Sequence, residues 1–308
     1  MKIEDLEKTK EVLKEIVPMK ELIAKADILI EALPYIRKFR GKEIIVKYGG
    51  SAMKSQETTD GVLQGLAFLN FVGIRPILIH GGGDAITANL KKAGIKTQFK
   101  EGHRVTDKES MKIVDDTLEE INKSIVHEIN HLGARAIGLG HGNEILTVNK
   151  KLINGADVGY VGEVEFVNTL ALRELTDAKI IPVIYPVGVD GEGNLYNVNA
   201  DEAAAKIAAA MNVAKIIFIT NVPGILKDPK DPKSLISSVS LQDVERMIEE
   251  GTISGGMIPK VQGALIALHG GVKKAHIIDG RVKNSVLLEI FTEAGIGTEI
   301  FIQDMNSH

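Results

Sequence analysis

The stretch IIVKYGGSAMKS, residues 44–55, decides the fold class of this 308-residue chain. A short apolar run typical of a buried strand leads to Lys47, and Gly49 and Gly50 follow after one intervening residue. Paired glycines let a backbone turn sharply and approach another group closely, and the lysine indicates that this group is anionic. The stretch is not a Walker A loop, because Met53 stands where that motif has its second glycine. It therefore predicts a strand that ends in an anion-binding turn of another kind.

Similar β-rich runs recur along the chain, and helical patterns separate most of them. The runs are KEIIVKY (42–48), RPILIH (75–80), ARAIGLG (134–140), KIIPVIY (179–185), AKIIFIT (214–220) and KKAHIID (273–279). Alternating elements of this kind predict an α/β fold with a mainly parallel sheet and helices on both faces. In such sheets ligands bind beyond the carboxyl ends of the strands, and the glycine pairs and clusters fall at these ends.

The first 40 residues are expected to be helical and to precede the first strand. Pro18 divides them, because proline breaks or kinks a helix. The second part has an apolar stripe at helical spacing, formed by Leu22, Ile23, Ile28, Leu29, Ile30 and Leu33. Such a helix either folds back on its own domain or docks on a neighbouring subunit, and the pattern favours neither.

Two features interrupt or divide the alternating pattern. Residues 143–169 lack helical spacing and contain several turn glycines, so they predict one or two β-hairpins. A boundary near residue 212 separates an alanine-rich helical pattern from the next strand. We therefore expect a helical extension over 1–40, a first lobe over 41–211 and a second lobe over 212–308.

The composition excludes several classes of protein. Apolar residues make up 44% and charged residues 25%, which allows a sizeable core. The formal net charge of −4 argues against a bulk attraction to nucleic acid. The absence of cysteine excludes disulfides, thiolate metal sites and cysteine catalysis. The histidines form no metal-spaced motif such as HExxH, so no protein metal ligand is predicted. No targeting segment or membrane-length apolar run is visible, and we expect a cytoplasmic protein without membrane contact.

The second glycine-rich turn is HGGGDAI, residues 80–86. Asp84 can cap the helix that follows, and the N–H groups of Gly81, Gly82 and Gly83 at a helix start would favour an anion. One glycine usually serves a tight turn, so three in a row favour a binding role. The stretch does not match GxGxxG, and a dinucleotide site has no support here.

The third turn, SGGMIPKV at residues 254–261, precedes a helix that Pro259 is suited to start. Lys260 would then lie in the first turn, where the helix dipole disfavours a cation. A bound anion would reverse that penalty. The alternative interpretation is an ordinary surface lysine.

Two polar stretches add further candidates. In LYNVNADEAAAKIA, Asn197, Asn199 and Asp201 alternate on an extended segment, which directs them to one side. Asp201 could cap the following helix, whereas the asparagines are harder to explain as caps. In EGHRVTDKES, Arg104 precedes a helix whose start is indicated by a capping-box spacing over 106–109. Arginine is suited to binding a carboxylate through two N–H groups, although an isolated one is more often a surface residue.

Together these stretches resemble the amino acid kinase family, and within it the arginine-inhibited branch that phosphorylates N-acetyl-L-glutamate. The matching motifs lie in the family's order between residues 44 and 261: VKYGGSAM, IHGGGDAI, GHRVTD, YNVNADEAA, TNVPGI and SGGMIPKV. ALPYIRKFRGK before the first strand and HIIDGRVKNSVLLEIFTEAGIGT near the end are similar to the regulated branch. The resemblance implies a three-layer α/β/α sandwich whose first lobe binds the amino acid and whose second lobe binds the nucleotide.

The resemblance also implies the reaction and its residues. The reaction is ATP-dependent phosphorylation of the side-chain carboxylate of N-acetyl-L-glutamate to an acyl phosphate in arginine biosynthesis, with Mg²⁺ bridging the nucleotide phosphates. Lys47 and Lys260 match two lysines that stabilise the transition state, and Asp201 matches the acid that holds them. The other matches are the phosphate-binding Gly49, Gly50 and Gly82 and the substrate-binding Gly82, Gly83, Arg104, Asn197 and Asn199.

Regulation by L-arginine is implied in the same way. The matching inhibitor-binding residues are Tyr35, Lys215, His276, Glu289 and Gly295. In the regulated branch the N-terminal helix links dimers into a hexameric ring, a trimer of dimers, which favours docking for residues 1–40. The chain departs from the family by carrying additional residues before the usual helix.

Three alternatives stay open. A related kinase of the same fold could act on glutamate itself, carbamate or UMP, although GHRVTD favours the acetylated substrate. A non-catalytic arginine sensor would be indicated by loss of Lys47, Lys260 or Asp201, and all three are present. Control by a signalling protein of the PII type is a third possibility that the sequence does not test.

Overall fold

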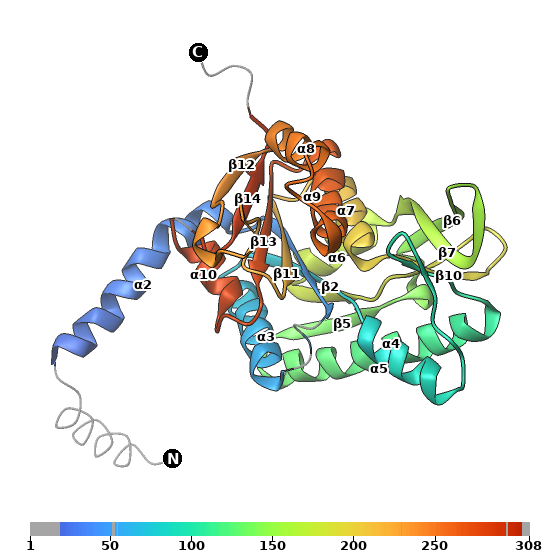
Figure 1. Cartoon of the computed structure of the whole chain (residues 1–308). Helices are drawn as coiled ribbons and strands as arrows, with labels where there is room; N and C mark the ends of the chain where they lie inside the picture. Colours follow the sequence, from blue (N-terminus) through green and yellow to red (C-terminus); the bar gives the residue numbers. More distant parts are fainter. Residues whose placement is uncertain (1–18, 51–52, 54, 229, 294, 304–308) are drawn as a thin grey trace.

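An eight-stranded sheet forms the centre of the protein, with helices on both of its faces (Figure 1). The structure is a computed structural model that describes residues 19–50, 53, 55–228, 230–293 and 295–303. The first predicted helix and the proline kink after it lie outside the described residues.

All six predicted β-rich runs form strands of this sheet, and β12 and β14 extend it. The order across the sheet is β12 (Ser238–Ser240), β14 (Thr298–Phe301), β13 (Lys274–Asp279), β11 (Lys215–Thr220), β1 (Glu43–Tyr48), β2 (Arg75–His80), β8 (Ile180–Ile184) and β5 (Arg135–Leu139). β13 and β14 are antiparallel, and the other six neighbouring pairs of the described sheet are parallel. The predicted mainly parallel sheet is therefore confirmed. Because β11 pairs with β1, the sheet continues across the boundary expected near residue 212.

The side chains of β1 alternate between two separate cores. Ile44 and Val46 face one core, and Ile45 faces the other, as the two-residue period of a strand requires. The first core is covered by α3 (Gln56–Phe71), α5 (Lys108–His131) and α10 (Ser285–Phe291). The second is covered by α6 (Thr169–Asp177), α7 (Ala200–Met211), α8 (Leu241–Glu249) and α9 (Ile258–His269). Lys47 shares the face of Ile45 and is thereby directed toward α7.

A small closed barrel projects from one end of the sheet. It contains β6 (Leu146–Ile153), β7 (Ala156–Val167), β9 (Val187–Val189) and β10 (Leu195–Asn197). β6 and β7 form one antiparallel hairpin, which confirms the hairpin predicted for residues 143–169. Asn154 and Gly155 both have positive φ at the turn, 50° and 74°, as favoured hairpin turns require.

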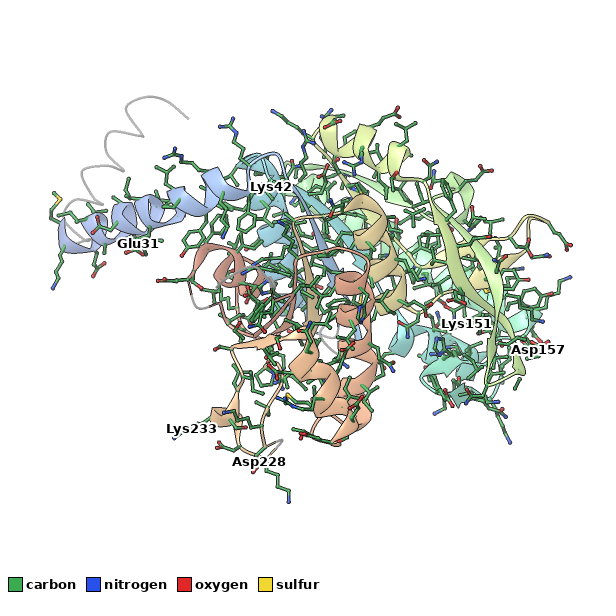
Figure 2. The ribbon with its side chains drawn as sticks, turned by 90° about the horizontal axis from the view of Figure 1, so that it is seen from above. Glu31, Lys42, Lys151, Asp157, Asp228 and Lys233 are labelled. Atoms are coloured by element: carbon green, nitrogen blue, oxygen red, sulfur yellow. The ribbon has the colours of Figure 1, made fainter. Side chains whose placement is uncertain are left out.

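Shorter elements complete the fold around this end. α4 (Gly83–Lys92) packs on α5, and β3 (Phe99–Lys100) pairs with β4 (His103–Arg104). The 3-10 turns whose bounds the described residues give are η2 (His141–Asn143), η3 (Pro232–Ser234) and η4 (Gly255–Met257). Viewed from above, the hairpin residues Lys151 and Asp157 lie at the end of the molecule opposite Glu31 (Figure 2).

Two predicted helix starts are wrong by one or two residues. α5 is capped by Asp107, whose side chain accepts a hydrogen bond of 2.8 Å from Ser110 N–H, and not by Thr106. The N–H of Thr106 donates to Val158 O over 3.0 Å, so pairing with β7 keeps that residue extended. α4 begins after Gly82, and Asp84 lies inside its first turn; there the acid complements the helix dipole without capping the helix.

The second predicted N-terminal helix is present as α2 (Met19–Phe39) and projects away from the body of the protein (Figure 1). Phe39 at its end is buried, whereas Ile28, Leu29 and Ile30 are 63%, 67% and 68% exposed. The described helix therefore does not fold back on its own domain, and its apolar stripe is uncovered. No helix among the described residues combines the length and apolar character needed to cross a membrane.

Candidate active site and regulatory pocket

The carboxyl ends of β1 and β2 bring two of the glycine turns into contact. A Cβ atom at Gly49 would lie 3.1 Å from Lys47 Nζ and 3.3 Å from the backbone nitrogen of Gly81. The Gly81 N–H donates to Tyr48 O over 2.8 Å. Gly50 has φ +67°, a conformation that favours glycine. Close approach of the two turns therefore favours glycine at position 49, and the backbone conformation favours it at position 50.

Lys47 and Asp201 form an ion pair at the centre of this arrangement. The distance from Lys47 Nζ to Asp201 Oδ1 is 2.7 Å, and the two side chains are 12% and 15% exposed. The strand alternation that directs Lys47 toward α7 produces this contact. A cation held at a fixed position beside glycine N–H groups can stabilise a phosphoryl group.

The carboxylate of Asp201 is available for this pair because another residue caps α7. Asn199 is the N-cap, and its Oδ1 accepts hydrogen bonds from Asp201 N–H at 2.8 Å and Glu202 N–H at 3.3 Å. The expectation that Asp201 could be the cap, and that Asn199 was hard to explain as one, is therefore wrong. The local reason is that helix α7 begins at Ala200, so Asp201 is already its second residue.

Arg104 lies in the same cleft and is held by neighbours on three segments. Its Nη2 donates to Gly83 O and to Thr87 Oγ1, both over 2.9 Å, and its Nη1 donates to Thr97 Oγ1 over 3.3 Å. Its guanidinium also lies 4.8 Å from the centre of the Phe99 ring. Burial lowers the pKa of Arg104, which nevertheless stays cationic at neutral pH. These contacts fix the plane of a guanidinium that can bind a carboxylate.

These groups line one cleft of about 210 Å³. The predicted residues that line it are Lys47, Gly50, Gly82, Gly83, Arg104, Asn197, Asn199 and Asp201. Gly49 lies beneath it, against Lys47 and Gly81. The structure thus collects residues that are up to 154 positions apart in the sequence, from Lys47 to Asp201, at the expected edge of the sheet.

Lys260 comes from the other lobe and is not part of the lining of this cleft among the described residues. It lies in the first turn of α9 (Ile258–His269), which has proline at its start as predicted. α9 packs directly on α7, because a Cβ at Gly263 would lie 3.3 Å from Asp201 Cβ. A Cβ at Gly102, in the cleft wall, would lie 3.9 Å from Pro259 Cγ. Pro259, which precedes Lys260, therefore lies against the cleft wall, and the start of α9 is close to the cleft.

One charged cluster beside the cleft was missed from the sequence. Glu202 Oε2 lies 2.7 Å from Lys151 Nζ and 3.6 Å from His103 Nε2. Burial alone would raise the pKa of Glu202, but hydrogen bonds and charges from His103 and Lys151 lower it. The cluster joins α7, β6 and β4 around the cleft. The sequence indicated this cluster only in that two of its members are next to predicted site residues: Glu202 follows Asp201, and His103 precedes Arg104.

A second pocket, of about 720 Å³, lies between the end of α2 and the C-terminal part of the sheet. Its lining includes all five predicted inhibitor-binding residues, Tyr35, Lys215, His276, Glu289 and Gly295. Gly295 has φ +62°, and a Cβ there would lie 2.7 Å from Glu289 Oε2. The left-handed backbone conformation favours glycine at this position, and any side chain would also displace that carboxylate.

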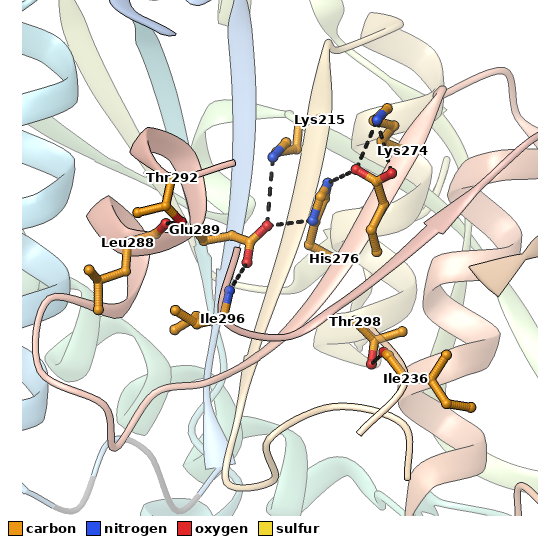
Figure 3. A network of polar contacts seen from close by, with 10 residues as sticks. Lys215, Ile236, Lys274, His276, Leu288, Glu289, Thr292, Ile296 and Thr298 are labelled. Carbon is orange, nitrogen blue, oxygen red and sulfur yellow. Dashed lines mark hydrogen bonds and ion pairs between the residues drawn. The ribbon is translucent and has the colours of Figure 1, made fainter. Parts of the chain in front are cut away.

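The charges of this pocket are shared by several buried groups (Figure 3). Glu289 Oε1 lies 2.6 Å from His276 Nδ1 and 3.7 Å from Lys215 Nζ, and its Oε2 accepts from Ile296 N–H at 3.0 Å. Burial lowers the pKa of Lys215 and of His276. Burial would raise the pKa of Glu289, but the hydrogen bond and charge of His276 lower it. An anionic carboxylate is thus buried among donors.

Glu299 was not predicted and also lines this pocket. It lies opposite His276 in the register of β13 and β14, 3.6 Å from His276 Nε2, and it pairs with Lys274 at 2.9 Å. The pairing of β13 with β14 was the missing information, because no local pattern placed these strands together. Two carboxylates therefore face a pocket that could hold a cationic ligand.

Comparisons with known proteins agree with this fold and these sites. Residues 42–279 match the model of the amino acid kinase family. An acetylglutamate kinase from Desulforamulus reducens is 48% identical over 280 residues, which cover 90% of this chain and 98% of that protein. The chain belongs to the amino acid kinase family, a family of phosphotransferases. Within that family its relatives place it among the acetylglutamate kinases.

Two solved structures share the fold over most of this chain. The N-acetylglutamate synthase from Neisseria gonorrhoeae, complexed with coenzyme A and N-acetyl-glutamate, has a TM-score of 0.80 at 26% identity. That match covers 91% of this chain and 64% of the other. The same synthase complexed with coenzyme A and L-arginine has a TM-score of 0.78 at 25% identity and covers 90% of this chain and 65% of the other.

Proposed function

We propose that this protein transfers the γ-phosphoryl group of ATP to the side-chain carboxylate of N-acetyl-L-glutamate, the step that gives N-acetyl-L-glutamyl 5-phosphate in arginine biosynthesis. The observation that carries the proposal is the Lys47–Asp201 pair beside the two glycine turns. The acetylglutamate kinases among its relatives support the same reaction. We also propose that it acts in the cytoplasm.

The reaction needs positioning and charge neutralisation more than acid–base chemistry. A carboxylate is already ionised at neutral pH, so its oxygen attacks the γ-phosphorus in line without a general base. The bond from that phosphorus to the β–γ bridging oxygen breaks, and ADP leaves with the electron pair. In this proposal Lys47 and Lys260 neutralise the moving phosphoryl group, and the N–H groups of Gly50 and Gly82 donate to its oxygens.

The amino acid is bound in the 210 Å³ cleft. Arg104 binds its α-carboxylate, with the guanidinium plane held by Thr87 and Thr97. Asn197 and the glycine turn at Gly83 contact the neighbouring groups of the substrate. Asn199 acts mainly as the cap of α7, so its contribution to binding is indirect. The 41–211 lobe supplies these groups, and the 212–308 lobe supplies the nucleotide site and Lys260.

Mg²⁺ bound to the ATP phosphates would neutralise their charge during transfer. The residues present fit an ion that is held by the phosphates and not by the protein, because the Asp201 carboxylate is already paired with Lys47 at 2.7 Å. No group of three or more His, Asp and Glu side chains among the described residues could hold a metal ion by itself. Magnesium that bridges phosphates takes most of its ligands from phosphate and water. Lys47 and the glycine turns then hold the phosphates, not the ion.

The second pocket is proposed as a site for feedback inhibition by L-arginine. The guanidinium of arginine would bind Glu289, which is buried, anionic and already surrounded by donors. Tyr35 at the end of α2 lines the same pocket, so a ligand there contacts both the helix and the sheet. Inhibition would follow if arginine favours one position of α2 and the sheet over another.

The uncovered stripe of α2 is proposed to dock on a second copy of the chain. Its exposed residues include Ile28, Leu29 and Ile30, and an apolar helix face of this kind marks an interaction surface. Docking of this helix between dimers would give the hexamer, a trimer of dimers, expected from the sequence. Control by a PII-type protein has no supporting observation.

The proposed function is tested by trapping the acyl phosphate with hydroxylamine during ATP consumption. We expect turnover with N-acetyl-L-glutamate, little turnover with L-glutamate, and suppression by L-arginine. Turnover that L-arginine leaves unchanged would remove the regulatory proposal and keep the enzyme. Folded protein that binds ATP and arginine without turnover would favour the arginine-sensor alternative.

A further inference from the structure

A buried histidine ends β2 directly before the three glycines of the cleft. His80 is 0% exposed. Its Nδ1 lies 3.0 Å from Gly81 O, and its Nε2 lies 3.1 Å from Asn122 Nδ2 on α5. The same amide nitrogen lies 2.8 Å from Val183 O on β8. A chain of polar contacts thus runs from the interior to the glycine turn.

Two carbonyl groups fix the direction of every hydrogen bond in this series of polar contacts. A carbonyl oxygen only accepts, so the atom next to Val183 O must be the amide nitrogen of Asn122. That nitrogen has two hydrogens, and the second points to His80 Nε2, which must therefore be unprotonated. The proton of the neutral imidazole then lies on Nδ1, where Gly81 O accepts it. The hydrogen bonds at Val183 O and at Gly81 O therefore require the same tautomer of His80.

The planarity of the peptide bond carries this constraint into the cleft. In a trans peptide the C=O of one residue and the N–H of the next are fixed in one plane and point in opposite directions. A hydrogen bond that holds Gly81 O against His80 therefore aims the Gly82 N–H to the other side. Without a side chain to limit it, a glycine backbone otherwise rotates with unusual freedom.

The next two glycine carbonyls are also bound by the protein. Gly82 O accepts from Ile86 N–H over 2.9 Å. Gly83 O accepts from Thr87 Oγ1 over 2.8 Å and from Arg104 Nη2 over 2.9 Å. Each of three consecutive carbonyls is thereby held by a partner within the protein. His80 is the anchor of the first, whose peptide carries the N–H assigned to the phosphoryl group.

We propose that His80 is a positioning residue for phosphoryl transfer, which holds the Gly81–Gly82 peptide so that the Gly82 N–H faces the transferred group, and that Asn122 fixes its tautomer. The proposal rests on the phosphotransfer proposed above. It concerns the orientation of a donor, and His80 itself does not contact the substrate.

Two further observations fit this role. Burial lowers the pKa of His80 to about 4, so the imidazole stays neutral at working pH and keeps the tautomer that donates to Gly81. Gly138 on β5 has no Cβ, and a Cβ there would overlap Asn122 Oδ1. The glycine in ARAIGLG therefore leaves room for the amide that orients the histidine.

A matched pair of variants distinguishes the hydrogen bond of His80 Nδ1 from that of His80 Nε2. In His80→Asn the side-chain amide nitrogen lies near the position of Nδ1 and still donates to Gly81 O. In His80→Gln the side-chain amide reaches the position of Nε2 and accepts from Asn122, but its donor to Gly81 O is lost. Both replace a buried imidazole by an amide, so their effects on stability should be similar.

We expect kcat of His80→Gln to fall about 10²-fold, the loss typical of a misplaced transition-state donor, with KM for N-acetyl-L-glutamate nearly unchanged. kcat of His80→Asn should stay within about tenfold of the wild type. Equal losses of kcat in the two variants, with equal losses in melting temperature, would overturn the proposal. So would a loss confined to KM.

The tautomer is measured separately by ¹⁵N NMR of the histidine side chain in the full-length protein. A proton on Nδ1 of His80 in the wild type, and its transfer to Nε2 or exchange between the two nitrogens in Asn122→Leu, is the expected result. A proton on Nε2 in the wild type would contradict the relay. This measurement needs no turnover, so it distinguishes failure of the relay from failure of the phosphotransfer assignment, which would leave the wild type inactive.

Discussion

The cleft and the second pocket both combine a lysine with a largely enclosed acid, but they divide the charge differently. In the cleft, Lys47 and Asp201 form a close pair at 2.7 Å. In the pocket, Glu289 is shared, with His276 at 2.6 Å and Lys215 at 3.7 Å. A close pair holds its lysine at one place, as catalysis requires. A shared acid with one distant partner can exchange that partner for a cationic ligand.

His80 and His276, both buried, likewise differ in how their hydrogen-bond partners are charged. His80 bonds to a carbonyl and an amide, both neutral, so it stays a fixed neutral donor. His276 bonds to a carboxylate and faces a second one, Glu299, across the strand pair. Burial lowers the pKa of both. The comparison teaches that His80 has only neutral partners that fix its orientation, whereas His276 lies between two carboxylates that a cationic ligand could also bind.

The largest expected effect is on the cleft pair. Lys47→Met removes a preorganised charge from the phosphoryl group, and kcat should fall about 10²- to 10³-fold. The matched control is Lys150→Met, which breaks a pair of the same 2.7 Å length with Asp157, but with side chains 44% and 62% exposed. Such surface pairs contribute little. Steady-state kinetics that show similar losses in both variants would contradict the role of Lys47.

The pocket should respond in inhibition and not in turnover. Glu289→Gln removes the buried charge proposed to bind the guanidinium, so the inhibitory concentration of L-arginine should rise about 10²-fold, with kcat little changed. The control is Glu293→Gln, an exposed acid that lines the same pocket and should change inhibition only slightly. The comparison fails if Glu289→Gln loses turnover while it keeps its sensitivity to arginine.

Acid should lower the stability of the protein through His80, the buried histidine that precedes the glycine turn of the cleft. The pKa of His80 is lowered from 6.5 to about 4 by burial, so below pH 6.5 the unfolded chain binds a proton that the folded protein does not. Stability is therefore fully present above the unfolded pKa and falls as pH decreases toward 4. The linkage costs about 2 kcal/mol at pH 5.

His80→Asn has no titrating group at this position and supplies the reference. Urea unfolding of both proteins at pH 7.5 and pH 5 should show a larger decrease in the free energy of unfolding for the wild type. Parallel decreases would mean that His80 titrates normally in the folded protein. The other buried groups, including His276, are common to both proteins and cancel in this difference.

Much of the fold and part of the cleft followed from local patterns. Apolar runs ending in glycine predicted β1 and β2, and parallel pairing placed Lys47 and the Gly81–Gly83 turn at one sheet edge. The two-residue alternation of Asn197, Asn199 and Asp201 correctly predicted one shared cleft. The residues proposed to bind an inhibitor were named by resemblance to a family, because no local pattern connects Tyr35 to a strand far along the chain.

The predictions that were wrong, and the contacts that were not predicted, depend on tertiary structure. Thr106 had the capping spacing, but its pairing with Val158 moved the helix start to the next residue. The Glu202–Lys151 pair joins positions 51 apart, and Asn122 on α5 reaches His80 at the end of β2. Neither pair has a sequence motif, because one contact is set by packing of α7 against the barrel and the other by packing of α5 against the sheet. Propensity and spacing describe only the near neighbours of a residue.

The smallest expected effect concerns α2, which connects assembly with regulation. Deleting residues 1–38 should give dimers without arginine inhibition, but the deletion also removes Tyr35 from the pocket. Leu29→Glu places a charge on the exposed stripe and leaves that tyrosine in place. Sedimentation should show a shift from hexamers to dimers, with arginine inhibition weakened about tenfold and basal turnover retained.

Lys25→Glu, a charge change on the same helix at an exposed polar position, is the control. A Leu29→Glu protein that stays hexameric would show that the stripe is not the contact, whereas dimers with full inhibition would place the whole regulatory response within one subunit pair.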